Sequence, residues 1–433
     1  MSCQRQGRWR PAWFIEIERE GHSAGGAEAA GERLAIYFRG DRGISDHGAY
    51  ALEHEMKILQ VLEREGIPVP HVYGFCDEPR GIVMERVPGR ADLGTAIDEA
   101  ERMAVQDDYM RILARVHDLD IAPFEAVGLE RPRDTERIAL SDFPIWEQGY
   151  RKSKSRPEPL IEFAVAWLLR NVPESSGRLS FVCADSGQFL FEAGRVTALL
   201  DLELAHLGDP AEDLAGLRGR DLSEPLGDLR RAVTTYESIT GRPVDRRLID
   251  YHTVRFTLIT PMAVARLVAA PAQGIDLVQY LCWYHVFGRA PIEVIAHMQG
   301  VPLEPPALPD PEPTRHASAH DFLAEALAPD AGADAFDTYA GDAAYRVAEY
   351  LRRSNLYGPA LEADDLDDAA RLLGSRPPDW SQADTLLEQA ILESGPERDA
   401  EWLWYLQRRS LRQEALLETV MRELQQSRIQ MLD

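Results

Sequence analysis

The chain has 433 residues, enough for more than one domain, and its hydrophobic content of 45% is typical of a globular protein. Its formal net charge is −25 and its pI is about 4.9, so nucleic acid and anionic membrane surfaces are poor partners. The start of the chain lacks the apolar core of a signal peptide, and no apolar run approaches the roughly 18 residues of a membrane span. The four cysteines lack metal-ligand spacing and favour free thiols in a reducing compartment. We therefore expect a cytoplasmic protein.

The first 40 residues predict two strands. Residues 13–19 alternate apolar and charged side chains, as a half-buried strand does, and residues 33–39 do so less regularly. The connection between them opens with a segment rich in glycine at 21–26, and residues 27–32 after it lack the alternation of a strand. We expect two strands joined by this loop.

A helix, a strand and a second helix follow. Residues 51–65 carry leucines and a methionine at helical spacing, and Gly-Ile-Pro-Val-Pro at 66–70 must end that helix. Residues 81–89 begin as an apolar strand and end in a Pro-Gly turn. Residues 109–119 are again helical, and His117 on their apolar pattern is expected to pack in the core rather than to act as a base.

Between these elements and residue 300 lie a basic cluster and a long helical stretch. The cluster at 151–157 reads Arg-Lys-Ser-Lys-Ser-Arg-Pro. Such a cluster could meet an anionic substrate such as a phosphate or a coenzyme A group, but a solvated loop is the favoured interpretation. Residues 248–298 read as helical and complete a helical lobe.

The stretch 181–214 places two aspartates on one short hairpin. Asp185 follows an apolar run, residues 188–191 and 195–200 read as two strands around a Glu-Ala-Gly turn, and Asp201 closes the second strand. A phosphoryl-transfer site needs such a pair, because one carboxylate accepts the proton of the attacking hydroxyl and a second holds the magnesium that neutralises the nucleotide phosphates.

The last third of the chain begins with a linker. Residues 301–316 are too rich in proline for a helix or a central strand, so an extended spacer is expected. Residues 317–433 then read as an acidic, all-helical appendage, with helices expected at 319–327, 340–353, 364–373, 382–394 and 397–430. The apolar stripe of the last helix can pack on the rest of the chain or on a second copy in a homodimer.

The stretch 181–214 resembles the catalytic and metal loops of the aminoglycoside phosphotransferase and choline kinase-like family. That family has His-Gly-Asp, four variable residues, Asn, a strand pair and Asp-x-Glu, whereas Cys183 and Ala184 stand here in place of His and Gly. The resemblance covers roughly residues 30–300. The form of residues 236–245 is similar to that of phosphotransferase domains that occur alone or joined to acyl-CoA dehydrogenases.

The resemblance implies roles for the hairpin residues. Asp185 takes the place of the catalytic base, and Asp201 that of the metal ligand. If the loop after Asp185 is two residues short, Gln188 occupies the Asn position; without that deletion Leu190 would, and its apolar side chain cannot bind magnesium. Glu203 assists the metal.

The resemblance also implies nucleotide contacts in the first lobe. Arg39 matches the basic residue that contacts the α- and β-phosphates, and Glu55 matches its glutamate partner, with Glu53 as a competing candidate. Ser23 lies in the turn that would cover the phosphates, although a surface loop is an equal alternative there.

In the connection between lobes, the backbone around Glu85 and Val87 would bind the adenine edge. The expected fold class is α+β, a protein kinase-like two-lobed fold with a small β-rich N-lobe, a helical C-lobe and an added all-α C-terminal domain. The expected domains are an N-lobe at 1–88, a C-lobe at 89–300, a linker at 301–316 and an appendage at 317–433. Asp213 is expected to tie a C-lobe helix to the catalytic loop.

The leading interpretation is an ATP- and Mg²⁺-dependent phosphotransferase acting on a hydroxyl of a small molecule, of the aminoglycoside, choline or hydroxyacyl type. The alternative is a catalytically degenerate kinase-like protein that binds a nucleotide or a protein partner. The replacements at Cys183 and Ala184 support the alternative, whereas the retention of Asp185, Asp201 and Glu203 supports activity.

Overall fold

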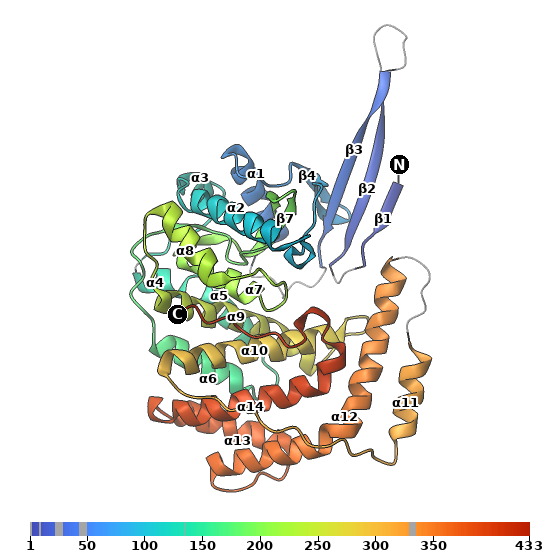
Figure 1. Cartoon of the computed structure of the whole chain (residues 1–433), viewed down its shortest axis with the longest axis vertical. Helices are drawn as coiled ribbons and strands as arrows, with labels where there is room; N and C mark the ends of the chain where they lie inside the picture. Colours follow the sequence, from blue (N-terminus) through green and yellow to red (C-terminus); the bar gives the residue numbers. More distant parts are fainter. Residues whose placement is uncertain (1, 8–9, 22–28, 43–49, 134, 329–334) are drawn as a thin grey trace.

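The N-terminal part of the chain folds into a five-stranded antiparallel sheet. The computed structural model describes residues 2–7, 10–21, 29–42, 50–133, 135–328 and 335–433. In sheet order the strands are β1 (Ser2–Arg5), β2 (Ala12–Gly21), β3 (Ala29–Gly40), β5 (Arg80–Glu85) and β4 (Val72–Asp77). Figure 1 shows that β1, β2 and β3 rise away from the rest of the molecule, whereas β4 lies close to helix α1 (Leu52–Arg64).

Both strands expected near the N-terminus form, and they pair with each other. Trp13 lies opposite Phe38, and their rings meet edge to face with centroids 5.6 Å apart. The alternation buries Ile36 and Phe38 on one face of the sheet. The expectation that residues 27–32 lack a strand is wrong from Ala29 onward, because backbone pairing with β2 does not require alternating side chains.

Helix α1 covers the sheet and ends where the sequence predicts. Its buried side chains include Leu59 and Leu62, which join Ile82 and Met84 of β5 in one apolar cluster. Burial of such side chains stabilises the fold by roughly 1.5–3 kcal/mol each. Glu55 is also buried on α1, and the helix contacts the short helical turn Leu202–Leu204 of the second lobe.

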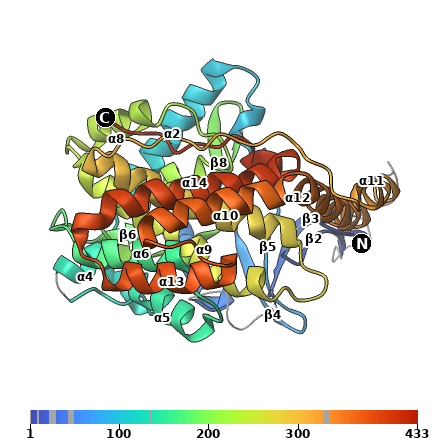
Figure 2. The same cartoon turned by 90° about the horizontal axis from the view of Figure 1, so that it is seen from below.

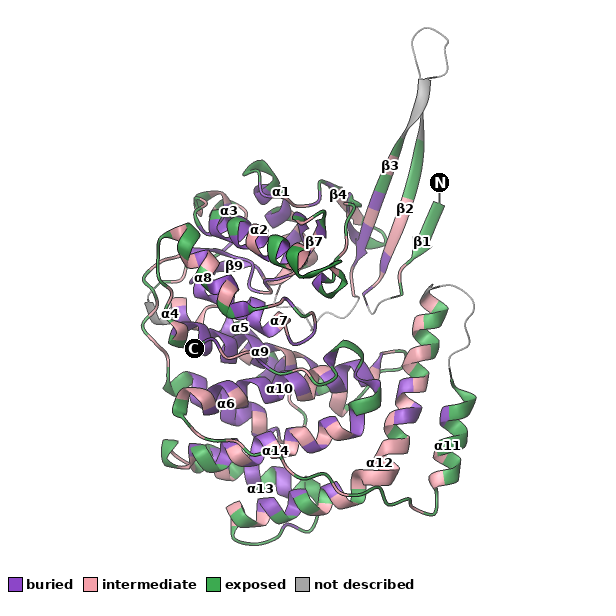
Figure 3. Ribbon diagram, viewed as in Figure 1, coloured by how far each residue is buried: buried purple, intermediate pink, exposed green. Residues whose placement is uncertain are grey.

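The middle of the chain forms a helical lobe with two small strand pairs. Its helices are α2 (Glu99–His117), α3 (Ala122–Ala126), α4 (Thr135–Leu140), α5 (Phe143–Ser153), α6 (Pro159–Arg170), α7 (Ala211–Arg220), α8 (Leu229–Thr240), α9 (Arg246–Ala269) and α10 (Leu277–Gln299). Strand β6 (Ser180–Val182) pairs with β9 (His206–Gly208), and β7 (Phe189–Glu192) pairs with β8 (Arg195–Leu199) as the expected hairpin. Figure 3 shows α9 and α10 buried along most of their length.

The C-terminal part is helical, but its boundaries differ from those expected. Its helices are α11 (Ala317–Ala326), α12 (Ala335–Leu373), α13 (Trp380–Glu393) and α14 (Asp399–Leu417). The prediction of separate helices at 340–353 and 364–373 is wrong, because α12 continues through Pro359. Proline removes one helical hydrogen bond, and the packing of α12 on α11, α13 and α14 outweighs that loss.

Helices α12, α13 and α14 share a core with the middle lobe. Figure 2 shows α14 running along α10, and Trp402 and Leu406 of α14 belong to the same buried cluster as Val286 of α10. The expected helix 397–430 ends at Leu417, and the chain beyond it crosses the middle lobe as short helical turns and an extended tail. The last helix therefore packs on the rest of the chain, and the homodimer stays a prediction. Within the described residues, no helix combines the length and apolar character needed to cross a membrane.

The basic segment 151–157 is only in part the solvated loop that the sequence favours, because it starts in α5 and pairs with carboxylates of neighbouring helices. Arg151 and Lys154 bind Glu162 of α6 at 2.5 and 2.6 Å, and Lys154 Nζ lies 2.7 Å from Glu388 Oε2 of α13. Arg151 and Lys154 thus connect α5 to α6 and α13, whereas Lys152 is exposed.

Candidate active site

The open end of the β7–β8 hairpin carries the two aspartates. Asp185 precedes β7 and Asp201 follows β8, and the hairpin closes between them through a hydrogen bond from Leu200 N to Gln188 O of 2.9 Å. Ala184 has a φ of 63° and Asp201 a φ of 55°, both in the left-handed region. A side chain there costs roughly 1–2 kcal/mol, which explains why glycine suits position 184.

Asp213 of α7 holds the loop before β7. Its carboxylate accepts hydrogen bonds from Cys183 N at 3.0 Å and from Ala184 N at 2.7 Å. It also lies 3.0 Å from His117 Nε2, and both of these side chains are fully buried. The predictions that Asp213 ties a helix to the catalytic loop and that His117 packs in the core are confirmed.

Asp185 is half-buried and held by two neighbours. Gln188 Nε2 donates to Asp185 Oδ2 at 2.7 Å, and Arg220 donates from Nε to Oδ1 at 3.1 Å and from Nη2 to Oδ2. Burial raises the pKa of Asp185, and the Arg220 guanidinium opposes part of that rise. Sequence reasoning missed Arg220, because nothing in its spacing indicates that it reaches Asp185.

Arg39 at the end of β3 connects α1 to the hairpin. Its Nε donates to Glu55 Oε2 at 2.7 Å and its Nη2 binds Asp201 Oδ1; Arg39 is 6% exposed and Glu55 2%. Burial raises the pKa of Glu55 even though Arg39 favours its charged form. Burial alone would also raise the pKa of Asp201, but Arg39 and further arginines hold it below its usual value. Glu53, the competing candidate, instead binds Arg80 at 2.7 Å.

The carboxylate of Glu203 is bound by arginines. Arg10 and Arg42 each bind one of its oxygens, and Arg39 Nη2 lies 3.6 Å from its Oε2. Arg10 precedes β2 and Arg42 follows β3, so the paired strands bring both guanidiniums to the same place. No sequence motif predicts that Arg10 and Arg42 contact Glu203. Their position follows only from the pairing of β2 with β3.

The predicted metal ligands Asp201, Gln188 and Glu203 fit magnesium in kind. Mg²⁺ prefers one or two carboxylates together with phosphate and water oxygens. In the described ranges, no three His, Cys, Asp or Glu side chains group closely enough to bind a metal by themselves. Asp201 here pairs with Arg39, and Gln188 donates to Asp185, so a metal at this place would depend on phosphate oxygens to complete its coordination.

The structure describes Glu85 and Val87, which are predicted to bind adenine, but not Ser23, which is predicted to cover the phosphates. Strand β5 ends at Glu85, whose N–H donates to His71 O at 2.8 Å, and Val87 follows in the connection between the lobes. Ser23 lies outside the described residues. The adenine contacts of Glu85 and Val87 and the phosphate contact of Ser23 stay predictions.

A buried ionic network, which we call the Arg255 network, consists of Asp142, His206, Glu212 and Arg255. Arg255 donates to Asp142 Oδ1 at 2.7 Å and to Glu212 Oε2 at 2.6 Å, and His206 Nε2 lies 3.0 Å from the same Glu212 oxygen. Burial would lower the pKa of His206, but Asp142 and Glu212 raise it to about 9. A protonated His206 thus fixes the segment between β9 and α7.

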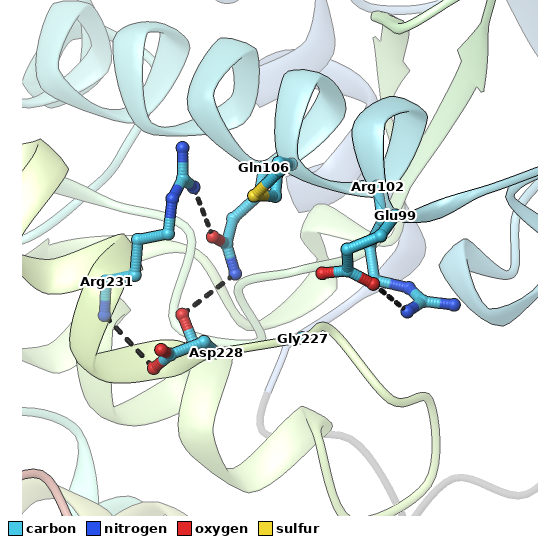
Figure 4. Close-up of a pocket in the computed structure, with 7 residues that line it drawn as sticks. Glu99, Arg102, Gln106, Gly227, Asp228 and Arg231 are labelled. Carbon is cyan, nitrogen blue, oxygen red and sulfur yellow. Dashed lines mark hydrogen bonds and ion pairs between the residues drawn. The ribbon is translucent and has the colours of Figure 1, made fainter.

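A cavity of about 140 Å³ lies between α2 and α8 (Figure 4). It is lined by Glu99, Arg102, Met103, Gln106, Gly227, Asp228 and Arg231. Its charges are paired within the wall: Arg102 binds Glu99, and Arg231 donates to Gln106 Oε1 at 2.9 Å. We therefore interpret it as part of the contact between these helices rather than as the acceptor site.

Known proteins resemble part of this chain. Residues 44–250 match the phosphotransferase enzyme family. The chain is 31% identical over 181 residues to acyl-CoA dehydrogenase family member 11 of Rattus norvegicus, and 28% identical over 179 residues to acyl-CoA dehydrogenase family member 10 of Mus musculus. Each match covers 39% of this chain but 23% and 16% of the relatives, so the chain spans less than a quarter of their length.

Among solved structures, that of a candidate aminoglycoside phosphotransferase from Ralstonia eutropha JMP134 is similar to the chain with a TM-score of 0.50. The identity is 20%, over 68% of this chain and 92% of that one, and likeness at this level shows the fold alone. The N-terminal sheet and the helical lobe below it are the two lobes of that architecture. The chain therefore has the expected protein kinase-like fold, and its residues 44–250 are similar to the phosphotransferase enzyme family.

Proposed function

We propose that the protein is an ATP- and Mg²⁺-dependent phosphotransferase that acts on a hydroxyl of a small molecule. One observation carries the proposal: Asp185 and Asp201 lie on one hairpin whose second aspartate contacts the buried Arg39–Glu55 pair. The match of residues 44–250 to the phosphotransferase enzyme family supports the transfer of a phosphoryl group, although a fold by itself does not decide the substrate.

In this proposal Asp185 accepts the proton of the acceptor hydroxyl while the hydroxyl oxygen attacks the γ-phosphorus of ATP. The bond from that phosphorus to the bridging oxygen breaks, and ADP leaves. Magnesium, when bound, neutralises the charge that develops on the phosphate oxygens. Asp201 and Gln188 would hold it, with Glu203 nearby. Arg39, kept in place by Glu55, would bind the α- and β-phosphates.

We assign the nucleotide phosphates to residues 1–88, with Ser23 covering them, and the catalytic and metal loops to residues 89–300. The backbone at Glu85 and Val87 would bind adenine. Residues 301–316 then act as the linker and residues 317–433 as the helical appendage. The curated relatives carry the name of acyl-CoA dehydrogenases, so a hydroxyacyl compound is the first acceptor class to test, before aminoglycosides and choline-like alcohols.

A second candidate is a nucleotide- or protein-binding module without catalysis. The observation that favours it is the state of Asp185, whose two oxygens are both bound by Arg220. A carboxylate with both oxygens bound in this way is less accessible to an acceptor hydroxyl. Cys183 in the position of the usual histidine points in the same direction.

Thermal-shift titrations with ATP and GTP, with and without Mg²⁺, separate the two candidates. A ligand that binds the native state raises its stability, so a nucleotide enzyme should show magnesium-dependent stabilisation in the wild type that is lost in Asp201→Asn. Glu125→Gln removes a partly exposed carboxylate that binds Arg131 and is the matched control. Stabilisation in the wild type and the control, followed by loss of turnover in Asp185→Asn with a hydroxyl acceptor, would support the enzyme. The absence of any shift in the wild type would reject it.

A further inference from the structure

Arg220 holds the candidate base Asp185 from a rigid helix. Helix α7 ends at Arg220, and its other turns are fixed against the catalytic loop, because Asp213 binds the loop N–H groups. The contact is close: a Cβ on Gly216 would lie 2.0 Å from Ala184 O. The backbone of α7 cannot move away from the catalytic loop without breaking these contacts. Arg220 can therefore exchange Asp185 for another anion only by a movement of its side chain.

The contacts of Asp185 leave little room for an acceptor hydroxyl. Its two oxygens together offer about four lone-pair sites. Arg220 takes one site on each oxygen, and Gln188 Nε2 takes a second site on Oδ2 at 2.7 Å. The two-pronged guanidinium contact also stabilises the charged carboxylate and makes it a weaker base. One site, on Oδ1, is left for an acceptor hydroxyl, and release of Arg220 would free a second site and make Asp185 a stronger base.

A released Arg220 needs another anion. Its side chain is 20% exposed, and a largely buried charge that loses its partner destabilises the protein strongly. Glu224 Oε1 lies 3.9 Å from Arg220 Nη1, too far for a hydrogen bond. Burial would lower the pKa of Arg220, but nearby carboxylates raise it, and Asp201 is one of them. The guanidinium thus lies within electrostatic reach of both hairpin aspartates, beside the place where the transferred phosphoryl group would sit.

We propose that Arg220 is a phosphate-binding residue that exchanges partners: it holds Asp185 in the ligand-free protein and moves to the γ-phosphate when a nucleoside triphosphate binds. This inference rests on the proposed function. A guanidinium binds phosphate and carboxylate with the same paired geometry, so the exchange keeps two charge-assisted hydrogen bonds. Nucleotide binding then frees Asp185, and the acceptor hydroxyl is activated second.

A double-mutant cycle on thermal stability tests the exchange, with Asp185→Asn, Arg220→Gln and the double variant. The four proteins are melted without ligand and with saturating Mg²⁺ and the β,γ-imido analogue of ATP. Without ligand, the double variant should lose less melting temperature than the two single losses added together. With the analogue the losses should become additive, and calorimetric titration of Arg220→Gln should show about tenfold weaker binding or more. Arg247→Gln, an exposed arginine at the start of α9, is the matched control and should change neither quantity.

The outcomes separate this inference from the proposed function. If Arg220→Gln binds the analogue as tightly as the wild type, or if the coupling to Asp185 persists in the bound state, Arg220 does not move and the inference is overturned while the nucleotide site stands. A wild type that binds no nucleotide would overturn both. Should Arg220→Gln not fold, Arg220→Lys replaces it, because lysine keeps the charge but cannot make the paired contact; the same loss of affinity is expected.

Discussion

Removal of the Asp213 carboxylate tests how the catalytic loop is held. In Asp213→Ala three buried donors lose their acceptor: the N–H groups of Cys183 and Ala184, and His117 Nε2. Each unpaired buried donor costs about 1–3 kcal/mol, and relaxation recovers part of the total, so the free energy of unfolding should fall by about 4 kcal/mol. Asp213→Asn keeps one oxygen acceptor and should lose about 2 kcal/mol.

Urea unfolding followed by circular dichroism measures these losses. Asp98→Ala serves as the control, because Asp98 also accepts a backbone hydrogen bond, from Glu101 N at 2.8 Å, but in an exposed N-cap. Loss of such a cap should cost about 1 kcal/mol. If Asp213→Ala loses no more than this control, the three buried hydrogen bonds do not hold the loop and the reasoning is refuted.

Three other features can be tested by measuring the stability of variants. Gln430 of the C-terminal tail donates to Asp221 Oδ2 and to Gly227 O at 2.7 and 2.8 Å, so Gln430→Ala should lower the free energy of unfolding in urea by about 1–2 kcal/mol; an unchanged value would mean that the tail does not brace this loop. The raised pKa of His206, about 9 in the Arg255 network against 6.5 unfolded, stabilises the protein fully below pH 6.5, and this contribution is lost as pH rises through 9. The stability difference between wild type and His206→Gln should therefore shrink by about 3 kcal/mol between those pH values, and a constant difference would contradict the shift. Ala184→Gly should raise the calorimetric melting temperature, because relief of roughly 1–2 kcal/mol of left-handed strain exceeds the entropy cost of glycine of roughly 0.5–1 kcal/mol; a lower melting temperature would show that Ala184 is unstrained.

Local patterns were enough to predict the elements that carry the candidate site. Alternation at residues 13–19 and helical spacing at 51–65 depend on neighbours in sequence, and both elements form there. The hairpin aspartates could likewise be found, because a strand pair around a short turn brings its two ends together. Arg39, Glu55 and Asp201 come from three separate segments, and the structure places them in contact.

Contacts between distant segments were beyond such reasoning. Arg220 meets Asp185 because α7 is anchored on the catalytic loop, and Arg10 meets Glu203 because β2 lies beside β3. Neither follows from spacing, since most arginines in a chain of this composition end in solvent. The prediction that the helix would break near Pro359 was wrong for a different reason. Proline disfavours a helix locally, but the packing of α12 on its neighbours compensates for that cost.

The ion pairs of the site suggest how a protein with a negative net charge could bind the phosphates of a nucleotide. The chain carries a net charge of −25, which repels a nucleotide at long range. At the site, however, each carboxylate of the network already has an arginine partner: Arg39 binds Glu55 and Asp201, and Arg220 binds Asp185. A nucleotide would meet a nearly neutral network rather than an open basic pocket. Under the proposed function its phosphates would take guanidiniums from these carboxylates, and the carboxylates released in that exchange would be the ones assigned to the metal and the acceptor hydroxyl.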